Sequence, residues 1–374
     1  MTEHSSFESV RPNGVIGILG GGQLGRMLCV AASQLGLRTH IFAPDEKSPA
    51  RDVCAINTIA QYDDEGALRA FARNVDVVTF EFENVPSEAV SILTDAGASV
   101  SPGAEALAIS QDRLVEKKFV IDIGAETAPF HPVDDLASLK TGLGVVGDRA
   151  VLKTRRLGYD GKGQTVIRKD QKDLELTWEQ ATQKAWEEIG ARPAILEGFV
   201  DFDCEISIIG ARSRNGQIAL FDPTENQHRT GILRRSSVPA KIAEKTIKQA
   251  KTIAASLLEK LDYVGVVGVE FFVLKNGDVL VNEFAPRVHN SGHWTLDACA
   301  VCQFEQHIRA VAGWPLGDPT RHSDAVMENL IGDDVDDWHD CAKEKNLCVH
   351  LYGKAKKLPG RKMGHVTKIS TRTG

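Results

Sequence analysis

Apolar and polar positions follow two different periods over the first hundred residues. Short apolar runs at 15–19, 39–43 and 75–83 have the length of buried strands, and the stretch 24–35 repeats its apolar positions at helical spacing. Parallel strands are covered on both faces and therefore appear as nearly continuous apolar runs. The pattern predicts an α/β unit built on a doubly wound parallel sheet, which Ser101-Pro102-Gly103 closes.

The rest of the chain predicts mixed α+β structure. A helix at 111–123 leads to strands at 150–153, 165–168 and 194–197, with a further helix at 174–189. Strands at 204–211 and 218–221 then precede a long helix at 240–261 and a strand pair at 264–284. We expect a polar tail at 1–14 and three domains, at 15–103, 104–200 and 201–374.

Composition narrows the classes of partner. The 374 residues carry a formal net charge of −7, so a global basic field for nucleic acid is absent, and the basic pairs have no interleaved aromatics. No apolar run approaches the roughly 18 residues of a membrane helix, and residues 1–14 lack the pattern of a signal peptide. Seven scattered cysteines predict a reducing, cytoplasmic location rather than a disulfide framework.

The first candidate site is a glycine loop. Gly20, Gly22 and Gly25 match G-x-G-x-x-G between a strand and a helix, and Asp45 and Glu46 follow about 20 residues later, as in a dinucleotide site. A site for a single phosphate and a plain tight turn explain the loop equally well. Glu81 and Glu83 alternate with phenylalanines, so we expect both on one face at the carboxyl end of the third strand.

A second candidate lies in the strand pair at 264–284. Asn276-Gly277 between apolar runs predicts a two-residue type I′ turn. That turn pairs residues whose numbers add up to 553, which places Glu270 directly opposite Glu283. Like charges across a strand pair repel, so either one carboxyl is protonated or a cation, such as magnesium bound to nucleotide phosphates, lies between them.

A second glycine loop runs from Lys153 to Gln164. It contains three glycines and four cations, which suits a flap over polyphosphate, and it lacks the Walker A pattern.

Seven motifs together resemble one family. They are Gly-Gly-Gly-Gln-Leu-Gly-Arg-Met at 20–27, Thr-Phe-Glu-Phe-Glu-Asn-Val-Pro at 79–86, Arg-Arg-Leu-Gly-Tyr-Asp-Gly-Lys-Gly-Gln at 155–164, Pro-Thr-Glu-Asn-Gln-His at 223–228, Gly-Ile-Leu-Arg at 231–234, Asn-Glu-Phe-Ala-Pro-Arg-Val-His-Asn-Ser-Gly-His-Trp-Thr at 282–295 and Gly-Arg-Lys-Met-Gly-His at 360–365. The chain resembles the 5-(carboxyamino)imidazole ribonucleotide synthases, ATP-grasp ligases of purine biosynthesis. The resemblance implies an ATP-grasp architecture, with a Rossmann-like substrate domain, a central lid and a C-terminal metal-binding domain. It also implies a homodimer.

The resemblance implies roles for individual residues. ATP would be bound by Arg113, Lys153, the flap residues Gly158, Tyr159, Asp160, Gly161, Lys162, Gly163 and Gln164, the adenine segment Glu197, Gly198, Phe199 and Val200, and by Glu205, His228, Asn282 and Glu283. The aminoimidazole ribonucleotide would meet Gln23, Leu24, Glu81, Tyr159, Asp160, Arg287, His289, Lys354 and Arg361. Glu270 and Glu283 would hold Mg²⁺, or Mn²⁺. The first glycine loop is thereby assigned to the ribonucleotide rather than to NAD.

The implied reaction activates bicarbonate with ATP. Attack of bicarbonate on the γ-phosphate gives carboxyphosphate, and the exocyclic amine of 5-aminoimidazole ribonucleotide then takes the carboxyl group. The residues closest to the chemistry would be Lys153, Asp160, Arg287 and His289, with Asp160, or His289 through water, as proton acceptor. Many ATP-grasp enzymes have a metal-binding asparagine where this chain has Ala285. The alternatives are a formate-dependent ligase of the same superfamily, an NAD-dependent oxidoreductase and a nucleotide sensor without turnover.

Overall fold

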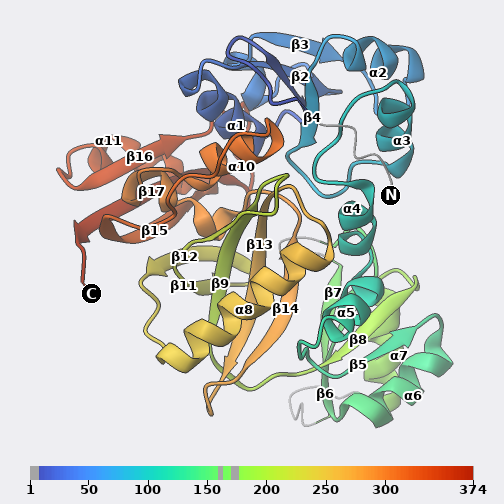
Figure 1. Ribbon diagram of the computed structural model, residues 1–374. Helices are drawn as coiled ribbons and strands as arrows, with labels where there is room; N and C mark the ends of the chain where they lie inside the picture. Colours follow the sequence, from blue (N-terminus) through green and yellow to red (C-terminus); the bar gives the residue numbers. More distant parts are fainter. Residues whose placement is uncertain (1–7, 159–162, 170–176, 374) are drawn as a thin grey trace.

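The N-terminal part of the chain forms a four-stranded parallel sheet. A computed structural model describes residues 8–158, 163–169 and 177–373. The strands run in the order β3-β2-β1-β4, and helices cover the sheet (Figure 1). The elements are β1 (Val15–Leu19), α1 (Gln23–Gln34), β2 (Arg38–Ala43), η1 (Pro49–Asp52), β3 (Ile56–Ile59), α2 (Glu65–Ala72), β4 (Val77–Phe80) and α3 (Ser87–Asp95). The predicted parallel sheet is confirmed.

Two details of this unit differ from the sequence-based prediction. The short strand β3 was not expected, because its alternating exposed residues give no apolar run. The third predicted strand, 75–83, is too long: β4 ends at Phe80, and Glu81 and Glu83 lie in the loop after it.

The middle of the chain forms a small antiparallel sheet in the order β5-β8-β6-β7. Its interior contains Leu139, Leu152 and Leu196, which are fully buried. Its elements and the two helices before it are α4 (Ala104–Ser110), α5 (Arg113–Asp122), β5 (Phe130–Val133), α6 (Leu136–Val146), β6 (Arg149–Thr154), β7 (Gln164–Arg168), α7 (Trp178–Glu188) and β8 (Ala194–Gly198). The helix expected at 174–189 begins at Trp178 among the described residues.

The third part is a nine-stranded antiparallel sheet in the order β14-β13-β9-β11-β12-β15-β17-β16, with β10 beside β9. Helix α8 lies along one face of β9, β13 and β14 (Figure 1). The elements are β9 (Phe202–Arg212), β10 (Ile218–Leu220), β11 (Thr224–Arg229), β12 (Ile232–Val238), α8 (Glu244–Lys260), β13 (Gly265–Leu274), β14 (Val279–Ala285), η2 (Asn290–Gly292), α9 (Thr295–Ala298), α10 (Gln303–Val311), β15 (Ser323–Ile331), η3 (Gly332–Asp337), α11 (Trp338–Cys341), β16 (Leu347–Leu351) and β17 (Lys362–Thr371).

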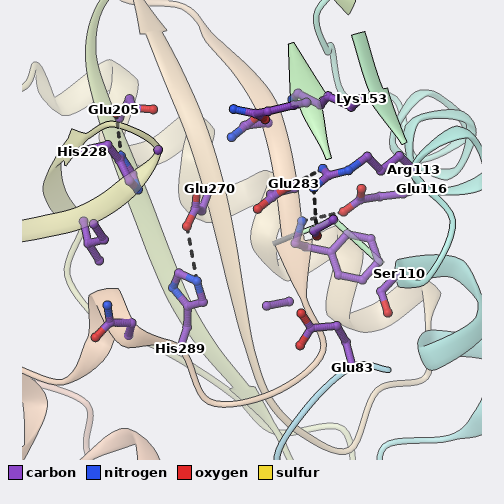
Figure 2. A pocket seen from close by; sticks show the side chains of 18 of the residues that line it. Glu83, Ser110, Arg113, Glu116, Lys153, Glu205, His228, Glu270, Glu283 and His289 are labelled. Atoms are coloured by element: carbon purple, nitrogen blue, oxygen red, sulfur yellow. Dashed lines mark hydrogen bonds and ion pairs between the residues drawn. The ribbon is translucent and has the colours of Figure 1, made fainter. Parts of the chain in front are cut away.

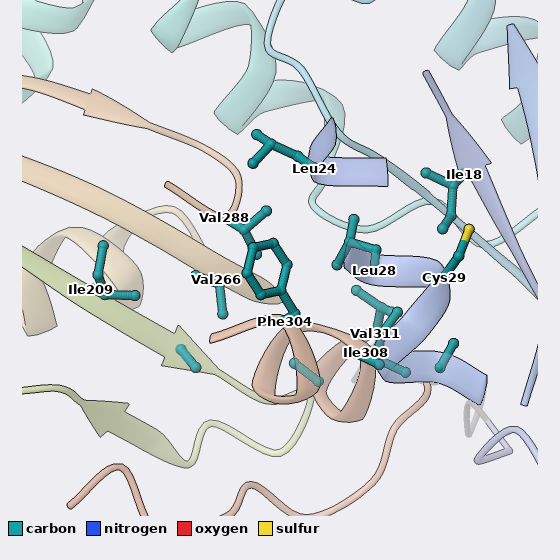
Figure 3. Packing of buried hydrophobic residues seen from close by; sticks show 14 of the residues in the cluster. Ile18, Leu24, Leu28, Cys29, Ile209, Val266, Val288, Phe304, Ile308 and Val311 are labelled. Atoms are coloured by element: carbon teal, nitrogen blue, oxygen red, sulfur yellow. The ribbon is translucent and has the colours of Figure 1, made fainter. Parts of the chain in front are cut away.

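A continuous apolar core joins the first sheet to the third. Leu24 and Leu28 of α1 belong to the same buried cluster as Phe304 and Ile308 of α10 and Val288 after β14 (Figure 3). The first glycine loop and the end of the hairpin that carries Glu270 and Glu283 are therefore held together by burial of apolar surface. No helix in the described ranges is long and apolar enough to cross a membrane.

Candidate active site

A cavity of about 610 Å³ lies where the three sheets meet. Its walls come from the loop after β4, the start of α5, strands β6, β8, β9, β13 and β14, and the loop 285–290. Acidic and basic side chains from these elements point into the same space (Figure 2). Its size is within the range of small-molecule sites.

The hairpin β13–β14 reaches the predicted pairing of Glu270 with Glu283 by a different route. Leu274 and Asp278 close a three-residue turn, in which Gly277 has a φ of 84°, so the predicted two-residue type I′ turn is wrong. The longer turn shifts the first pairs, such as Phe271 with Val281, by one residue. A β-bulge then leaves Asn282 unpaired and restores Glu270 opposite Glu283.

The two opposed carboxylates have different electrostatic environments. Burial, and then the charge of Glu283, raise the pKa of Glu270. Burial also opposes ionisation of Glu283, but Arg113 and Lys153 outweigh it and hold the pKa of Glu283 low. The Arg113 Nη1 lies 2.6 Å from the Glu283 Oε2 (Figure 2). Glu283 therefore tends to stay ionised, whereas Glu270 takes up a proton more readily.

The donor set around this pair fits a hard divalent cation. Glu270 and Glu283 offer carboxylate oxygens, and the buried Asn282 Oδ1 has no hydrogen-bond partner. Oxygen ligands of this kind are what Mg²⁺ and Mn²⁺ prefer. The Ala285 side chain, at the position where the resemblance implied an asparagine ligand, carries no oxygen.

Hydrogen bonds orient His289 toward Glu270. The His289 Nδ1 accepts from the Ser291 backbone N–H and lies 2.9 Å from the Ser291 Oγ, while its Nε2 lies 3.3 Å from the Glu270 Oε1. A buried chain runs on from Ser291 through the hydroxyl of Ser207 to the side chain of Asn226. Burial, and then the charge of Arg287, lower the pKa of His289 to about 3. Because Nδ1 accepts from the Ser291 N–H, Nε2 is the ring nitrogen left to donate to Glu270.

Lys153 and Glu197 form part of the opposite wall, and Lys117 lies behind them. The Glu197 Oε2 lies 3.0 Å from the Lys153 Nζ and 3.6 Å from the Lys117 Nζ. Burial raises the pKa of Glu197, but the two ammonium groups outweigh it and lower the pKa to about 2. Its other oxygen, Oε1, is buried and has no partner, so it can accept from a ligand N–H.

The base of the second glycine loop is fixed to α5. Asp112 caps this helix through the N–H of Leu114 and also accepts two bonds from the Arg155 guanidinium, at 3.1 and 2.7 Å. The Arg113 Nη2 contacts the Gly158 carbonyl at 3.4 Å. The first residues of the flap therefore contact the same turn of α5 whose Arg113 binds Glu283.

A carboxylate–imidazole pair lies at the far end of the cavity. The Glu205 Oε2 lies 2.8 Å from the His228 Nδ1. Burial lowers the pKa of His228, but the hydrogen bond to Glu205 and the charge of Glu270 outweigh it and raise the pKa.

The anion site of the first glycine loop is filled by the protein itself. The Glu81 carboxylate accepts from the N–H groups of Gly22 and Gly25, the second at 2.7 Å. Burial raises the pKa of Glu81, and these N–H groups oppose the rise. A pyrophosphate would have to displace this buried carboxylate, so the dinucleotide interpretation of the loop is wrong. Glu81 instead binds the loop backbone and lines the cavity.

Glu83 forms an ion pair with Arg287 on the opposite side of the cavity. Burial raises the pKa of Glu83, but Arg287 outweighs it and lowers the pKa. The partners are 204 residues apart in the sequence, so no spacing could reveal the pair.

The cavity brings together most of the predicted site residues. It is lined by Gln23, Leu24, Glu81, Arg113, Lys153, Gly158, Gln164, Glu197, Gly198, Phe199, Val200, Glu205, His228, Glu270, Asn282, Glu283, Arg287 and His289. Gly163, Lys354 and Arg361 are not among the lining residues, although Lys354 contributes a positive charge near Glu81. Tyr159, Asp160, Gly161 and Lys162 lie outside the described residues.

Sequence reasoning missed several side chains at this site. Glu116, Arg155 and Lys362 line the cavity, and Lys117 contacts Glu197 behind it. Glu83, which the alternation with phenylalanines had singled out, also lines the cavity. Lys362 directly follows Arg361 in the motif at 360–365. The motif therefore indicated the right segment, but the residue chosen from it was the neighbour of the one that lines the cavity. Glu116 and Lys117 lie within a helical stretch that carried no motif.

Family models match successive stretches of the chain. The ribonucleotide synthetase preATP-grasp domain matches residues 14–111, the ATP-grasp domain matches 118–304, and the phosphoribosylaminoimidazole carboxylase C-terminal domain matches 325–374.

Relatives of known name match over nearly the whole length. The chain is 54% identical over 365 residues to the N5-carboxyaminoimidazole ribonucleotide synthase of Brucella melitensis, which covers 98% of this chain and 99% of that protein. The N5-carboxyaminoimidazole synthetase of Staphylococcus aureus complexed with ADP has a TM-score of 0.90 at 35% identity, covering 97% and 95% of the two chains. The corresponding synthase of Aspergillus clavatus, in complex with ADP and 5-aminoimidazole ribonucleotide, has a TM-score of 0.88 at 26% identity, covering 96% and 95%.

These matches confirm the resemblance read from the motifs and the ATP-grasp architecture it implied. They leave no support for the oxidoreductase alternative, whose glycine-loop site Glu81 already fills. The chain belongs to the N5-carboxyaminoimidazole ribonucleotide synthase family of ATP-grasp ligases.

Proposed function

We propose that this chain uses ATP and bicarbonate to carboxylate 5-aminoimidazole ribonucleotide, giving 5-(carboxyamino)imidazole ribonucleotide, ADP and phosphate in purine biosynthesis. The observation that carries the proposal is the opposed pair Glu270–Glu283 in a cavity that also holds Arg113, Lys153 and Arg287. The relative from Aspergillus clavatus binds ADP and 5-aminoimidazole ribonucleotide, and both ligands suit such a cavity.

ATP would lie between the small sheet and the hairpin. Lys153 and Arg113 are placed to neutralise its phosphates, and the unpartnered Oε1 of Glu197 is placed to accept from the adenine amino group. Glu205, held by His228, would accept from ribose hydroxyls. We assign Glu270 and Glu283, with the Asn282 amide oxygen, as the residues that hold Mg²⁺ or Mn²⁺. Such an ion supplies charge neutralisation and orientation for the phosphates.

The residues around this pair would promote formation of carboxyphosphate. A bicarbonate oxygen bonds to the γ-phosphorus while the bond to the β–γ bridging oxygen breaks and ADP leaves. Phosphoryl transfer of this kind requires positioning and positive charge more than a covalent protein nucleophile. Lys153 and Arg113 supply fixed positive charge from two different elements, β6 and α5.

The ribonucleotide would lie on the other side of the hairpin, toward the first glycine loop. Its exocyclic nitrogen then bonds to the carboxyl carbon, the bond from that carbon to the phosphate oxygen breaks, and the departing phosphate takes the proton that the nitrogen loses. Gln23, Leu24 and Glu81 line this side, and Arg287 is fixed there by Glu83. The His289 Nδ1 accepts from the Ser291 N–H and its Nε2 faces the Glu270 Oε1, so we assign His289 to holding Glu270 rather than to accepting the proton.

Phosphate release from ATP tests the proposal. We expect release only when Mg²⁺, bicarbonate and 5-aminoimidazole ribonucleotide are all present. Release that needs formate and another ribonucleotide would keep the ATP-grasp chemistry and refute the substrate assignment.

The variant Glu283→Gln should lower turnover by roughly 100-fold or more, because it removes the permanent anion of the pair. Lys275→Met is the matched control, because Lys275 lies on the same hairpin with its side chain 71% exposed, and we expect parental turnover. Parental turnover in Glu283→Gln would refute the assignment of the metal pair.

We also propose that the chain forms a homodimer in a reducing compartment and that it consists of the three parts 15–103, 104–200 and 201–374. All seven cysteines are free thiols in the structure. Light scattering of the purified chain tests the dimer, and a mass of one chain would refute it.

A further inference from the structure

The strand that carries Glu283 is the edge of the nine-stranded sheet. An edge strand presents unpaired backbone N–H and C=O groups, and a bulge leaves additional groups without ladder partners. Strand β14 has both features around Asn282. Unless other groups satisfy this backbone, the position of Glu283 is weakly determined.

Buried side chains of α5 satisfy it. The Glu116 Oε1 accepts from the Phe284 N–H at 2.7 Å, and the Lys117 Nζ donates to the Asn282 carbonyl at 2.6 Å (Figure 2 shows the first of these). Both side chains are almost fully buried, with 2% and 1% exposure. One contact lies on each side of Glu283 along the strand.

The segment after α5 extends the same contact. The Glu126 carbonyl accepts from the Val281 N–H, and the Thr127 hydroxyl donates to the Val281 carbonyl, both at 2.8 Å. Lys117 in turn donates to the Thr127 Oγ1 at 2.8 Å. The backbone from Val281 to Phe284 is thus held from outside the hairpin at four polar groups.

We propose that Glu116 and Lys117 are positioning residues that hold the bulged edge of β14, and thereby keep Glu283 opposite Glu270 for the divalent cation. The inference rests on the proposed function for the role of the cation, but not for the backbone contacts. Neither residue needs to touch ATP: Glu116 acts through the Phe284 N–H and Lys117 through the Asn282 carbonyl. Supporting residues of this kind commonly change metal affinity 10- to 100-fold when they are removed.

The test compares Glu116→Ala and Lys117→Met with the conservative Glu116→Gln. Glutamine keeps an Oε1 acceptor for the Phe284 N–H, whereas alanine leaves this N–H without a partner. We expect Glu116→Ala to weaken Mn²⁺ binding to the ADP complex by about tenfold or more, measured by electron paramagnetic resonance. Glu116→Gln should stay within threefold of the parent, as should Lys275→Met on the exposed tip of the same hairpin.

Affinity for ADP measured in EDTA distinguishes a specific effect on the metal pair from a general disruption of the nucleotide site. Glu116→Ala should change metal-free ADP affinity by less than threefold, since Glu116 accepts from the Phe284 N–H, whereas Glu197 is held by Lys153 and Lys117. An equal loss of ADP and Mn²⁺ affinity would overturn the positioning role.

Hydrogen exchange of the backbone at 279–286 provides a measurement that needs no metal. We expect faster exchange in Glu116→Ala and Lys117→Met than in the parent, and parental exchange in Glu116→Gln. Unchanged exchange together with unchanged Mn²⁺ affinity would overturn the proposal. Faster exchange in a chain whose parent binds no Mn²⁺ would support the hold on β14 and refute the metal assignment in the proposed function.

Discussion

Replacement of Glu270 by glutamine should stabilise the metal-free protein at pH 8, although Glu270 lies at the centre of the site. Burial, and then the charge of Glu283, raise its pKa to about 7, from an ordinary value of 4.5. Below pH 4.5 both the folded and the unfolded state hold the proton, so this group does not affect stability. Between pH 4.5 and 7 the unfolded state loses its proton first, and the free energy of unfolding falls as the pH rises.

Above pH 7 the full effect is present. Each pH unit between the folded and unfolded pKa corresponds to about 1.4 kcal/mol, so the ionised Glu270 costs the metal-free fold about 3 kcal/mol. Glutamine has nearly the same shape and cannot ionise. We therefore expect Glu270→Gln to raise the free energy of unfolding by about 3 kcal/mol at pH 8 and by less than about 1 kcal/mol at pH 5.

The opposite carboxylate supplies the control. The pKa of Glu283 is held low by Arg113 and Lys153, so its charge stabilises the fold at pH 8. Glu283→Gln should therefore lower stability at that pH, whereas Glu270→Gln raises it. Urea unfolding followed by tryptophan fluorescence, in EDTA and without nucleotide, measures both variants at pH 5 and pH 8. A change of the same sign in the two variants at pH 8 would refute the reasoning.

Three further variants test other parts of the structure. Arg287→Gln leaves the half-buried Glu83 without its cation and should lower the free energy of unfolding by about 1–3 kcal/mol, measured in urea; an unchanged value would contradict the contribution of this ion pair. Trp294→Ala removes a fully buried indole and should cost about 3–5 kcal/mol in the same assay, and a loss under about 1 kcal/mol would show that the core closes around it. Gly22→Ala would place a Cβ 2.6 Å from the Glu81 Oε1, so we expect affinity for the ribonucleotide to fall about tenfold, while calorimetry finds ADP affinity unchanged. Equal losses for both ligands would indicate that Glu81 serves the whole cavity.

Local pattern predicted much of the architecture. The apolar runs at 15–19 and 39–43 became β1 and β2, because parallel strands buried on both faces leave an unmistakable run. The run at 75–83 misled at its end, since Phe82 continued the apolar pattern after the strand had stopped at Phe80. An apolar pattern indicates which residues are packed against the core, and a loop that packs there can continue the pattern beyond the end of a strand.

The opposition of Glu270 and Glu283 was predicted correctly from a wrong turn. Asn276-Gly277 does form the turn, but with one more residue than expected, and the bulge at Asn282 removes the difference. Nothing in the hairpin sequence reveals this bulge, because its backbone partners are on α5. For the same reason no local pattern pointed to Glu116 or Lys117, whose role depends on a strand more than 160 residues away.

The hairpin also shows where the chain can change length. The pairing near the tip is set by the turn, whereas the backbone beside Glu283 is fixed by α5 and the segment at 126–127. Extra residues between Lys275 and Gly277 would alter the local pairing without transmitting a shift to the acidic pair. The tip of this hairpin is therefore a suitable insertion point for an epitope or a fluorescent reporter domain, and a segment in which natural variation in length would be tolerated.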